Sequence, residues 1–165
     1  MSRTDEWYTE TETVKKCYQL LNPKPGSVIL CPFDTEKSEF VKIGQSMGHT
    51  IIFGINDFIE GDLYRCDYIC TNPPFSLKDK VIEKCFEYGV ETMLVMPLDV
   101  MGGIKRRKLY QRYGFPRIWM PIRRIAYFDS NWVRRPASNF HSILLHLNHG
   151  RESEIMWEKD AACLS

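Results

Sequence analysis

Four consecutive residues carry groups that could grip an amine on a flat ring: Asn72, Pro73, Pro74 and Phe75. The two prolines fix φ and remove two backbone N–H donors, so the turn is stiff and presents mainly acceptors. The Asn72 amide supplies a carbonyl oxygen, and the face of Phe75 can stack on a ring. The set therefore suits a planar group with an exocyclic amine. The alternative is a rigid turn without chemistry, although an apolar core does not require an asparagine there.

The flanking segments predict where this turn lies. Residues 67–71 form a short apolar run, which is typical of a buried parallel strand. Ser76 and Asp79 have the spacing of a capping box, which predicts a helix with Ser76 as its N-cap. The turn should then stand at the carboxyl end of a strand, directly before a helix. Open α/β sheets bind their ligands at that edge.

Apolar periodicity predicts alternating helices and strands over the first two thirds of the chain. Thr9 and Glu12 have the spacing of a capping box for the first helix, and Gly48 is a candidate C-terminal cap of the second. The pattern predicts helices over 9–21, 35–47, 77–88 and 104–113, and strands over 27–31, 50–55, 67–71, 91–96, 117–120, 122–128, 140–147 and 154–157. This order predicts one α/β domain over residues 1–165, with a mainly parallel sheet and antiparallel strands at its C-terminal edge.

The net charge of the 165-residue chain is only +1, but its charges are unevenly distributed. Between Ile104 and Pro136 there are ten Lys and Arg residues and one acid, Asp129. Such a stretch favours binding of a polyanion, although it is also compatible with a solvated basic face. Trp132 or Tyr127 could act as a wedge between bases, or simply pack in a hairpin. The candidate contacts to nucleic acid are Lys105, Arg106, Arg107, Lys108, Arg134 and Arg135.

The six cysteines predict reduced thiols in a cytoplasmic protein. They are scattered, and neither they nor the four histidines form a zinc-binding pattern, so we expect no metal. No apolar run approaches the roughly 18 residues of a membrane span. The first twelve residues are acidic and polar, which is unlike a signal peptide.

In this context the Asn-Pro-Pro-Phe sequence resembles the catalytic motif of amino-group methyltransferases. The likeness is strongest to the DNA adenine-N6 enzymes that use S-adenosylmethionine, in a minimal phage or mobile-element form. Segments 6–9, 31–34, 56–58 and 140–145 resemble further parts of that family, and the likeness covers about residues 6–148. It implies a Rossmann-like sheet, with the cofactor held by Tyr8, Thr9, Cys31, Pro32, Phe33, Asp34, Asp57 and Phe58.

The chain departs from the family pattern at the expected cofactor site. Residues 34–38 contain no glycine, where the family has a glycine-rich loop. Gly54 stands where an acid is expected for the ribose hydroxyls, and Asp57 follows so soon that one helix-strand unit is missing. Asp34 can be read as a helix N-cap or as a ligand of the cofactor amino group. Asp57 can be read as a loop carboxylate or as the ligand of the cofactor adenine.

The resemblance implies methylation of the adenine N6 amine in DNA, with the base extruded from the stack. The amide oxygen of Asn72 and the carbonyl of Pro73 would accept the two N–H groups of the amine, and Phe75 would stack on the base. A glutamine side chain in a protein, or a base in RNA, also suits such a turn. A degenerate fold that binds nucleic acid or a partner without catalysis is a third possibility. The expected partner is DNA, and no membrane is expected to be involved. Whether the protein forms a homodimer is left open.

Overall fold

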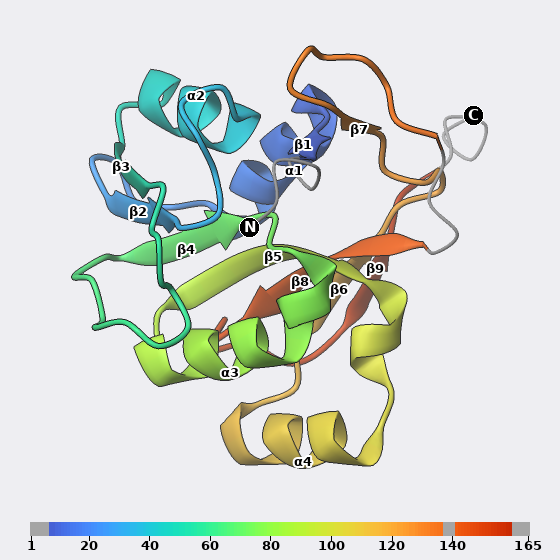
Figure 1. Ribbon diagram of the computed structural model, residues 1–165. Coiled ribbons are helices and arrows are strands. Elements are labelled where there is room, and N and C mark those ends of the chain that lie inside the picture. The colour runs from blue at the N-terminus through green and yellow to red at the C-terminus, as the bar shows by residue number, and fades with distance from the viewer. Residues whose placement is uncertain (1–6, 137–140, 160–165) are drawn as a thin grey trace.

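A central seven-stranded sheet dominates the computed structural model, which describes residues 7–136 and 141–159 (Figure 1). The strand order is β3-β2-β4-β5-β8-β6-β9. These strands are β2 (Val28–Cys31), β3 (Thr50–Phe53), β4 (Tyr68–Thr71), β5 (Glu91–Pro97), β6 (Arg117–Met120), β8 (Ser142–Leu147) and β9 (Ile155–Trp157). A separate two-stranded sheet pairs β1 (Tyr8–Thr9) with β7 (Tyr127–Phe128).

Only β8 runs against the other strands of the large sheet. It lies between β5 and β6 and is antiparallel to both, whereas β9 pairs parallel with β6. The predicted class, a mainly parallel sheet with an antiparallel part near the C-terminus, is confirmed. The reversed strand is inside the sheet, so β5 has a hydrogen-bonded partner on each side.

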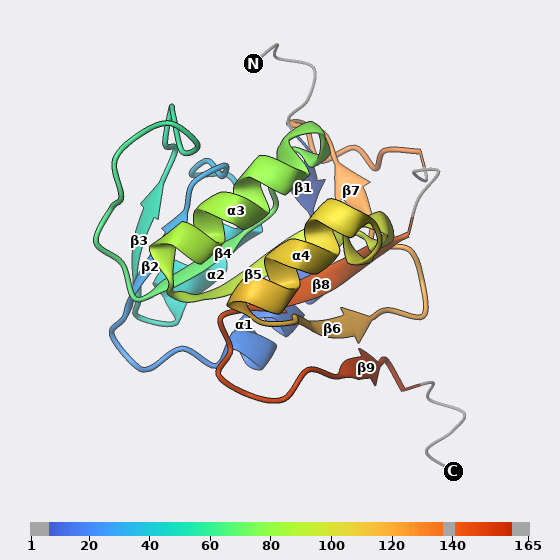
Figure 2. The same ribbon diagram turned by 90° about the horizontal axis from the view of Figure 1, so that it is seen from below.

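Two helices cover each face of the sheet (Figures 1 and 2). Helices α1 (Thr11–Leu21) and α2 (Glu39–Ser46) lie on one face, and α3 (Lys78–Tyr88) and α4 (Ile104–Tyr113) lie on the other. Each face has its own apolar core, because the buried strand residues alternate between the two sides. Two short 3₁₀ helices, η1 (Phe75–Leu77) and η2 (Leu98–Met101), follow β4 and β5.

Three predicted helix starts are wrong. Thr9 is not a cap, because its backbone is extended in β1 and α1 begins after Glu10. The helix predicted from residue 35 begins at Glu39, capped by Ser38, whose hydroxyl accepts the N–H of Phe40 at 3.2 Å. Ser76 lies within η1 and makes no cap for α3.

The strand-rich tail is less regular than predicted. Of the strand expected over 122–128, only Tyr127 and Phe128 form β7. The strand expected from residue 140 begins at Ser142, and Phe140 itself lies outside the described residues. None of the helices in the described ranges is long and apolar enough to cross a membrane.

The chain passes from β3 to β4 through residues 54–67 without a helix or strand, as expected for a missing helix-strand unit. Phe58 closes the gap. Phe58 is 4% exposed and belongs to the core under α3. Its ring stacks on the Tyr88 ring with centroids 5.5 Å apart and meets the Phe33 ring edge to face at 5.3 Å. One aromatic side chain thus covers part of the sheet face that a helix would otherwise cover.

We expect Phe58→Ala to destabilise the protein by about 3–5 kcal/mol, because it removes a buried ring whose cavity the loop cannot fill. Urea unfolding followed by circular dichroism would measure the loss. Leu63→Ala in the same segment is the control, because Leu63 is 48% exposed and should change stability by less than about 0.5 kcal/mol. Equal losses in the two variants would contradict the role given to Phe58.

Candidate active site

The loops after β2, β3, β4 and β5 meet at one edge of the sheet, because these four strands are parallel. The edge therefore gathers segments that are far apart in sequence: 32–38, 54–58, 72–75 and 98–101. Most residues predicted to bind cofactor or acceptor lie in these segments.

Asn72 follows the last residue of β4 and has an unusual side chain. Its amide oxygen Oδ1 is enclosed and has no hydrogen-bond partner among the residues that the structure describes. A buried acceptor left without a donor costs about 1–3 kcal/mol. Buried polar groups are nearly always paired, so an orphan of this kind marks a position where a ligand donor can contribute.

Phe75 forms one wall of a pocket of about 400 Å³. Its ring meets Tyr127 edge to face, with centroids 6.5 Å apart. The pocket lies beside the Asn72 turn and the start of η2, and its lining consists of Phe75, Lys78, Pro97, Leu98, Asp99 and His141. Its lining is largely apolar, with charged groups contributed by Lys78 and Asp99.

The lining residues beyond Phe75 were not predicted as site residues. Lys78 and Asp99 form an ion pair at 3.2 Å, which joins the start of α3 to η2. His141 Nε2 lies 3.0 Å from the carbonyl oxygen of Pro121 and donates its proton there. The available signal was positional: Leu98 and Asp99 follow a parallel strand at the same edge as Asn72.

Asp34 belongs to the loop that joins β2 to α2, and its carboxyl group is buried. The hydroxyl of Ser38 donates to its Oδ1 at 2.7 Å, and the hydroxyl of Thr71 donates to its Oδ2 at 2.5 Å. Reading it as the N-cap of the second helix is wrong, because Ser38 occupies that position. Thr71 is the residue before Asn72, so Asp34 links the β2 loop to the Asn-Pro-Pro-Phe turn.

Burial raises the pKa of Asp34 to about 7, and the two hydroxyl donors offset part of this increase. The neighbouring titratable groups are neutral. Burial also raises the pKa of the Cys31 and Cys70 thiols and of the Tyr18 phenol. Among the residues that the structure describes, no cationic group pairs with Asp34.

The N-terminal segment lies over this loop. The Tyr8 hydroxyl is 3.0 Å from the Thr35 hydroxyl, which brings β1 against the segment after β2. Thr9 is 3% exposed, and within the described ranges its buried Oγ1 has no hydrogen-bond partner. Thr9 is therefore a second orphaned polar group, in a segment predicted to contact cofactor.

The other predicted cofactor residues are divided between the core and the surface. Phe33 and Phe58 pack against each other in the core, and Cys31 is completely buried at the end of β2. The Pro32 carbonyl accepts the N–H of Ile55 at 3.0 Å. Asp57 is exposed and accepts the N–H of Glu60 at 3.1 Å, so it caps its own turn.

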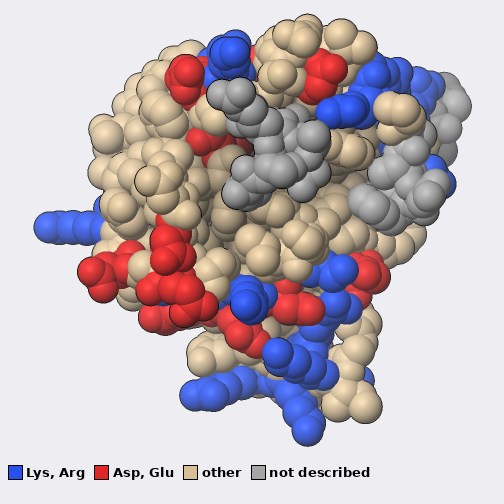
Figure 3. All heavy atoms as spheres, viewed as in Figure 1, with Lys and Arg blue, Asp and Glu red and all other residues tan. Residues whose placement is uncertain are grey.

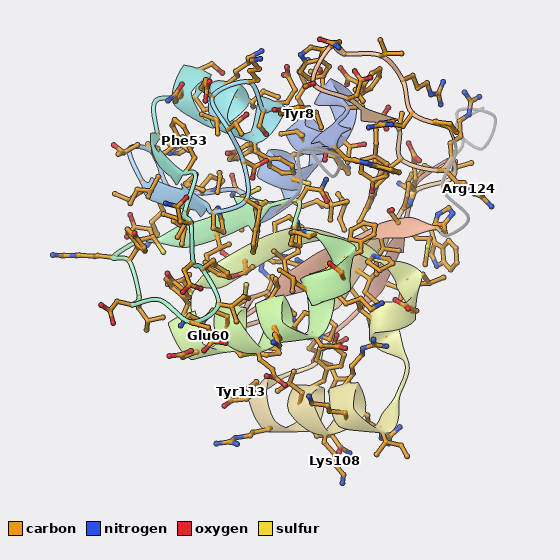
Figure 4. All side chains as sticks on the ribbon, in the orientation of Figure 1. Tyr8, Phe53, Glu60, Lys108, Tyr113 and Arg124 are labelled. Atoms are coloured by element: carbon orange, nitrogen blue, oxygen red, sulfur yellow. The ribbon has the colours of Figure 1, made fainter. Side chains whose placement is uncertain are left out.

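The predicted nucleic-acid contacts form two separate groups (Figure 3). In Figure 4, Lys108 extends from α4 while Arg124 extends from the segment before β7, far from it. Lys105, Arg107 and Lys108 are exposed on α4. Arg106 differs, because its Nε donates to Asp79 at 2.7 Å and its Nη1 to the Asp99 carbonyl at 2.7 Å.

The second basic group belongs to the hairpin that follows β7. Arg134 is exposed, whereas the Arg135 guanidinium lies 5.7 Å from the centre of the Trp7 ring. Trp132 stacks on Tyr8 with centroids 5.7 Å apart, and Tyr127 is buried, which favours packing over a wedge role for both. In the described part of the chain, no group of three or more His, Cys, Asp or Glu could hold a metal ion.

The fold matches solved methyltransferases. A protein assigned as a modification subunit of a type I restriction enzyme in Vibrio vulnificus YJ016 is similar over 92% of this chain and 47% of its own, with a TM-score of 0.56 and 15% identity. The 23S rRNA methyltransferase ErmE matches over 94% and 73%, with a TM-score of 0.52 and 12% identity. A dimethyladenosine transferase from Plasmodium falciparum matches over 85% and 61%, with a TM-score of 0.52 and 10% identity.

The chain has the methyltransferase fold. It spans about half the length of the Vibrio subunit. No protein-family model matches the sequence, and no curated protein matches it. The comparisons therefore support the fold and leave the substrate to be argued from the site.

The residues at the strand edge fit a cofactor of the S-adenosylmethionine type. Thr9 and Asn72 present orphaned polar atoms, and Asp34 presents a buried carboxyl group without a cationic partner. A cationic, polar ligand with hydrogen-bond donors complements this set.

We expect Asp34→Asn to change the pH dependence of stability. The folded-state pKa of about 7 exceeds the unfolded value of 3.8, so the fold favours the protonated carboxyl group. This contribution is fully present below about pH 4 and is lost as pH rises to about 7. Asparagine keeps the shape without the charge. Relative to wild type, the variant should therefore gain about 2–3 kcal/mol between pH 5 and pH 8.

Urea unfolding at both pH values measures this change, with exposed Asp62→Asn as the matched control. If the unfolding free energies of Asp34→Asn and wild type differ by the same amount at pH 5 and at pH 8, Asp34 ionises normally in the fold.

Proposed function

We propose that this protein transfers a methyl group from S-adenosylmethionine to the exocyclic N6 amine of adenine in DNA. The observation that carries the proposal is the enclosed, unpartnered Oδ1 of Asn72 at the end of β4. Three residues further along the chain, Phe75 bounds an apolar pocket at the edge where the parallel strands end, in a sheet with the methyltransferase fold.

Asn72 is required to make an aromatic amine more nucleophilic by reducing the delocalisation of its lone pair into the ring. The lone pair of adenine N6 is conjugated with the ring, which makes it a poor nucleophile. Asn72 Oδ1 and the Pro73 carbonyl would each accept one N–H, so that the nitrogen becomes more tetrahedral and its lone pair leaves the ring plane. Both acceptors are neutral and fixed in place by the prolines, so they need no reorganisation during the reaction.

Phe75 supplies the matching contact for the ring. An aromatic wall and an apolar pocket stabilise a base by stacking once it has left the helix. When bound, S-adenosylmethionine supplies a methyl group activated by the positive charge on sulfur. Thr9 and Asp34 are the residues that would hold it, and catalysis then depends mainly on positioning.

Two alternative functions differ in acceptor or activity. A base in RNA would use the same turn and pocket, and the similar structures include a 23S rRNA methyltransferase. A binding protein without catalysis is favoured by the absence of glycine from residues 34–38. Transfer of labelled methyl to DNA, RNA and protein, followed by nucleoside analysis, distinguishes these functions. N6-methyladenine in DNA alone is the result expected.

We expect Asn72→Ala to reduce methyl transfer by at least about 100-fold, because it removes a preorganised acceptor for the amine. The affinity for S-adenosylmethionine should stay within about threefold of wild type. Gln19→Ala is the control, because it removes an exposed amide from α1, away from the strand edge. An Asn72→Ala variant with near-normal activity would remove the catalytic assignment.

The α4 side chains should contribute electrostatically to binding of nucleic acid. Replacing Lys105 and Lys108 together by Gln should weaken binding and reduce the slope of log affinity against log salt by about 1–2, as expected for the loss of two phosphate contacts. The double variant Lys15→Gln/Lys24→Gln loses the same charge from exposed positions on other elements. If both double variants have the same slope as wild type, α4 does not contact the phosphates.

A further inference from the structure

A buried carboxyl group without a counter-ion is unusual in this protein. Asp34 is 8% exposed, and the side-chain hydrogen bonds it accepts in the described part of the chain come from the hydroxyls of Ser38 and Thr71. By contrast, the Asp79 carboxylate, which pairs with Arg106, is more exposed than Asp34. Burying an unpaired charge is costly, so such a group either stays protonated or awaits a cationic partner.

The position of Asp34 indicates which partner could reach it. It belongs to the loop after β2, at the edge of the sheet where ligands bind, and through Thr71 it is one residue away from Asn72. The Tyr8–Thr35 contact adds β1 to the same region. A ligand placed between β1, this loop and the Asn72 turn would lie close to the carboxyl group.

The charges of the two forms of the cofactor differ by one. In S-adenosylmethionine the ammonium and carboxylate of the amino acid cancel, and the sulfonium leaves a net charge of +1. In S-adenosylhomocysteine, the demethylated product, the sulfur is neutral and the net charge is zero. An ionised carboxylate nearby therefore favours the first over the second.

We infer that Asp34 is the counter-charge that makes this site prefer S-adenosylmethionine over S-adenosylhomocysteine, and that it releases its proton to solvent when the cationic cofactor binds. This inference depends on the proposed function for its ligand. The proton balance is simple: protonated Asp34 plus the sulfonium ligand gives ionised Asp34 in the complex and one proton in the buffer. The product carries the same ammonium and carboxylate but lacks the sulfonium charge, so it induces no such release from a carboxylate that faces the sulfur.

The surroundings of Asp34 support the same direction. In the free protein burial raises its pKa to about 7, so the carboxyl group is largely protonated at pH 6. The titratable groups facing it are Tyr18 from α1, Cys31 from β2 and Cys70 from β4, and all three stay neutral because burial raises their pKa. The α2 side contributes only the Ser38 hydroxyl to it. Asp34 is therefore the group in this cluster that changes charge near neutral pH.

The sign of the pH effect follows from proton release. Bound S-adenosylmethionine lowers the pKa of Asp34 in the complex. At pH values between that lowered pKa and the pKa of about 7 in the free protein, each unit of pH raises the affinity for S-adenosylmethionine by up to tenfold. Above about pH 7 the affinity becomes constant. Binding should thus be up to about tenfold weaker at pH 6 than at pH 8. The affinity for S-adenosylhomocysteine should change by less than about twofold.

Isothermal titration calorimetry of the full chain tests this directly. Each ligand is titrated at pH 6 and pH 8, in pairs of buffers with different ionisation enthalpies, so that the proton release is read from the difference in heat. We expect close to one proton released per S-adenosylmethionine at pH 6 and almost none at pH 8. Asp34→Asn should abolish the release and reduce the preference for S-adenosylmethionine about tenfold at pH 8, while Asp62→Asn behaves as wild type.

Thr71→Val gives an independent test if Asp34→Asn does not fold. It removes a hydrogen bond that lowers the Asp34 pKa, so the midpoint of the pH dependence should move to higher pH. Binding without proton release at pH 6, or an unmoved midpoint in Thr71→Val, would overturn the inference while leaving the proposed function intact. If neither ligand binds at millimolar concentration, the proposed function itself fails.

Discussion

The hydrogen bond between Thr71 and Asp34 is the contact on which the candidate site depends. Strands β2 and β4 are neighbours, and their loops diverge at the end of the sheet, one toward α2 and the other toward the Asn72 turn. A bond of 2.5 Å between their side chains holds the two loops together at that point. Ser38 extends the connection to the start of α2. A side chain thus provides the rigidity that a close backbone contact could provide in a glycine-rich loop.

The connection from β3 to β4 is short because one helix-strand unit of the family pattern is missing. Residues 54–67 replace the unit, and Phe58 fills the core between Phe33 and Tyr88. Because Phe33 follows β2 directly, its ring anchors the same loop that carries Asp34. Packing on the α3 face and hydrogen bonding on the α2 face therefore position one short segment from both sides of the sheet.

The sequence was sufficient for features determined by local pattern and insufficient for those determined by distant partners. The strand before Asn72 was predicted, because an apolar run followed by two prolines has few alternatives. The prediction that Thr9 caps the first helix is wrong because Thr9 lies in β1 and pairs with Tyr127, more than a hundred residues later. Of the two readings of Asp34, the helix cap is wrong, because Ser38 caps α2 and the Asp34 carboxyl group accepts hydrogen bonds from the hydroxyl groups of Ser38 and of Thr71, 37 residues away. His141 joins the pocket only through the placement of β8 beside β5, which no periodicity reveals.

The basic helix and the pocket are mechanically connected. Little of α4 is buried apart from Tyr110, whose hydroxyl donates to the Val100 carbonyl in η2 at 2.8 Å. Arg106 ties the same helix to Asp79 of α3 and to the Asp99 carbonyl. Because Asp99 and Leu98 line the pocket, α4 is anchored on the residues that shape it. These contacts fix the position of α4 relative to the pocket wall that contains Leu98 and Asp99.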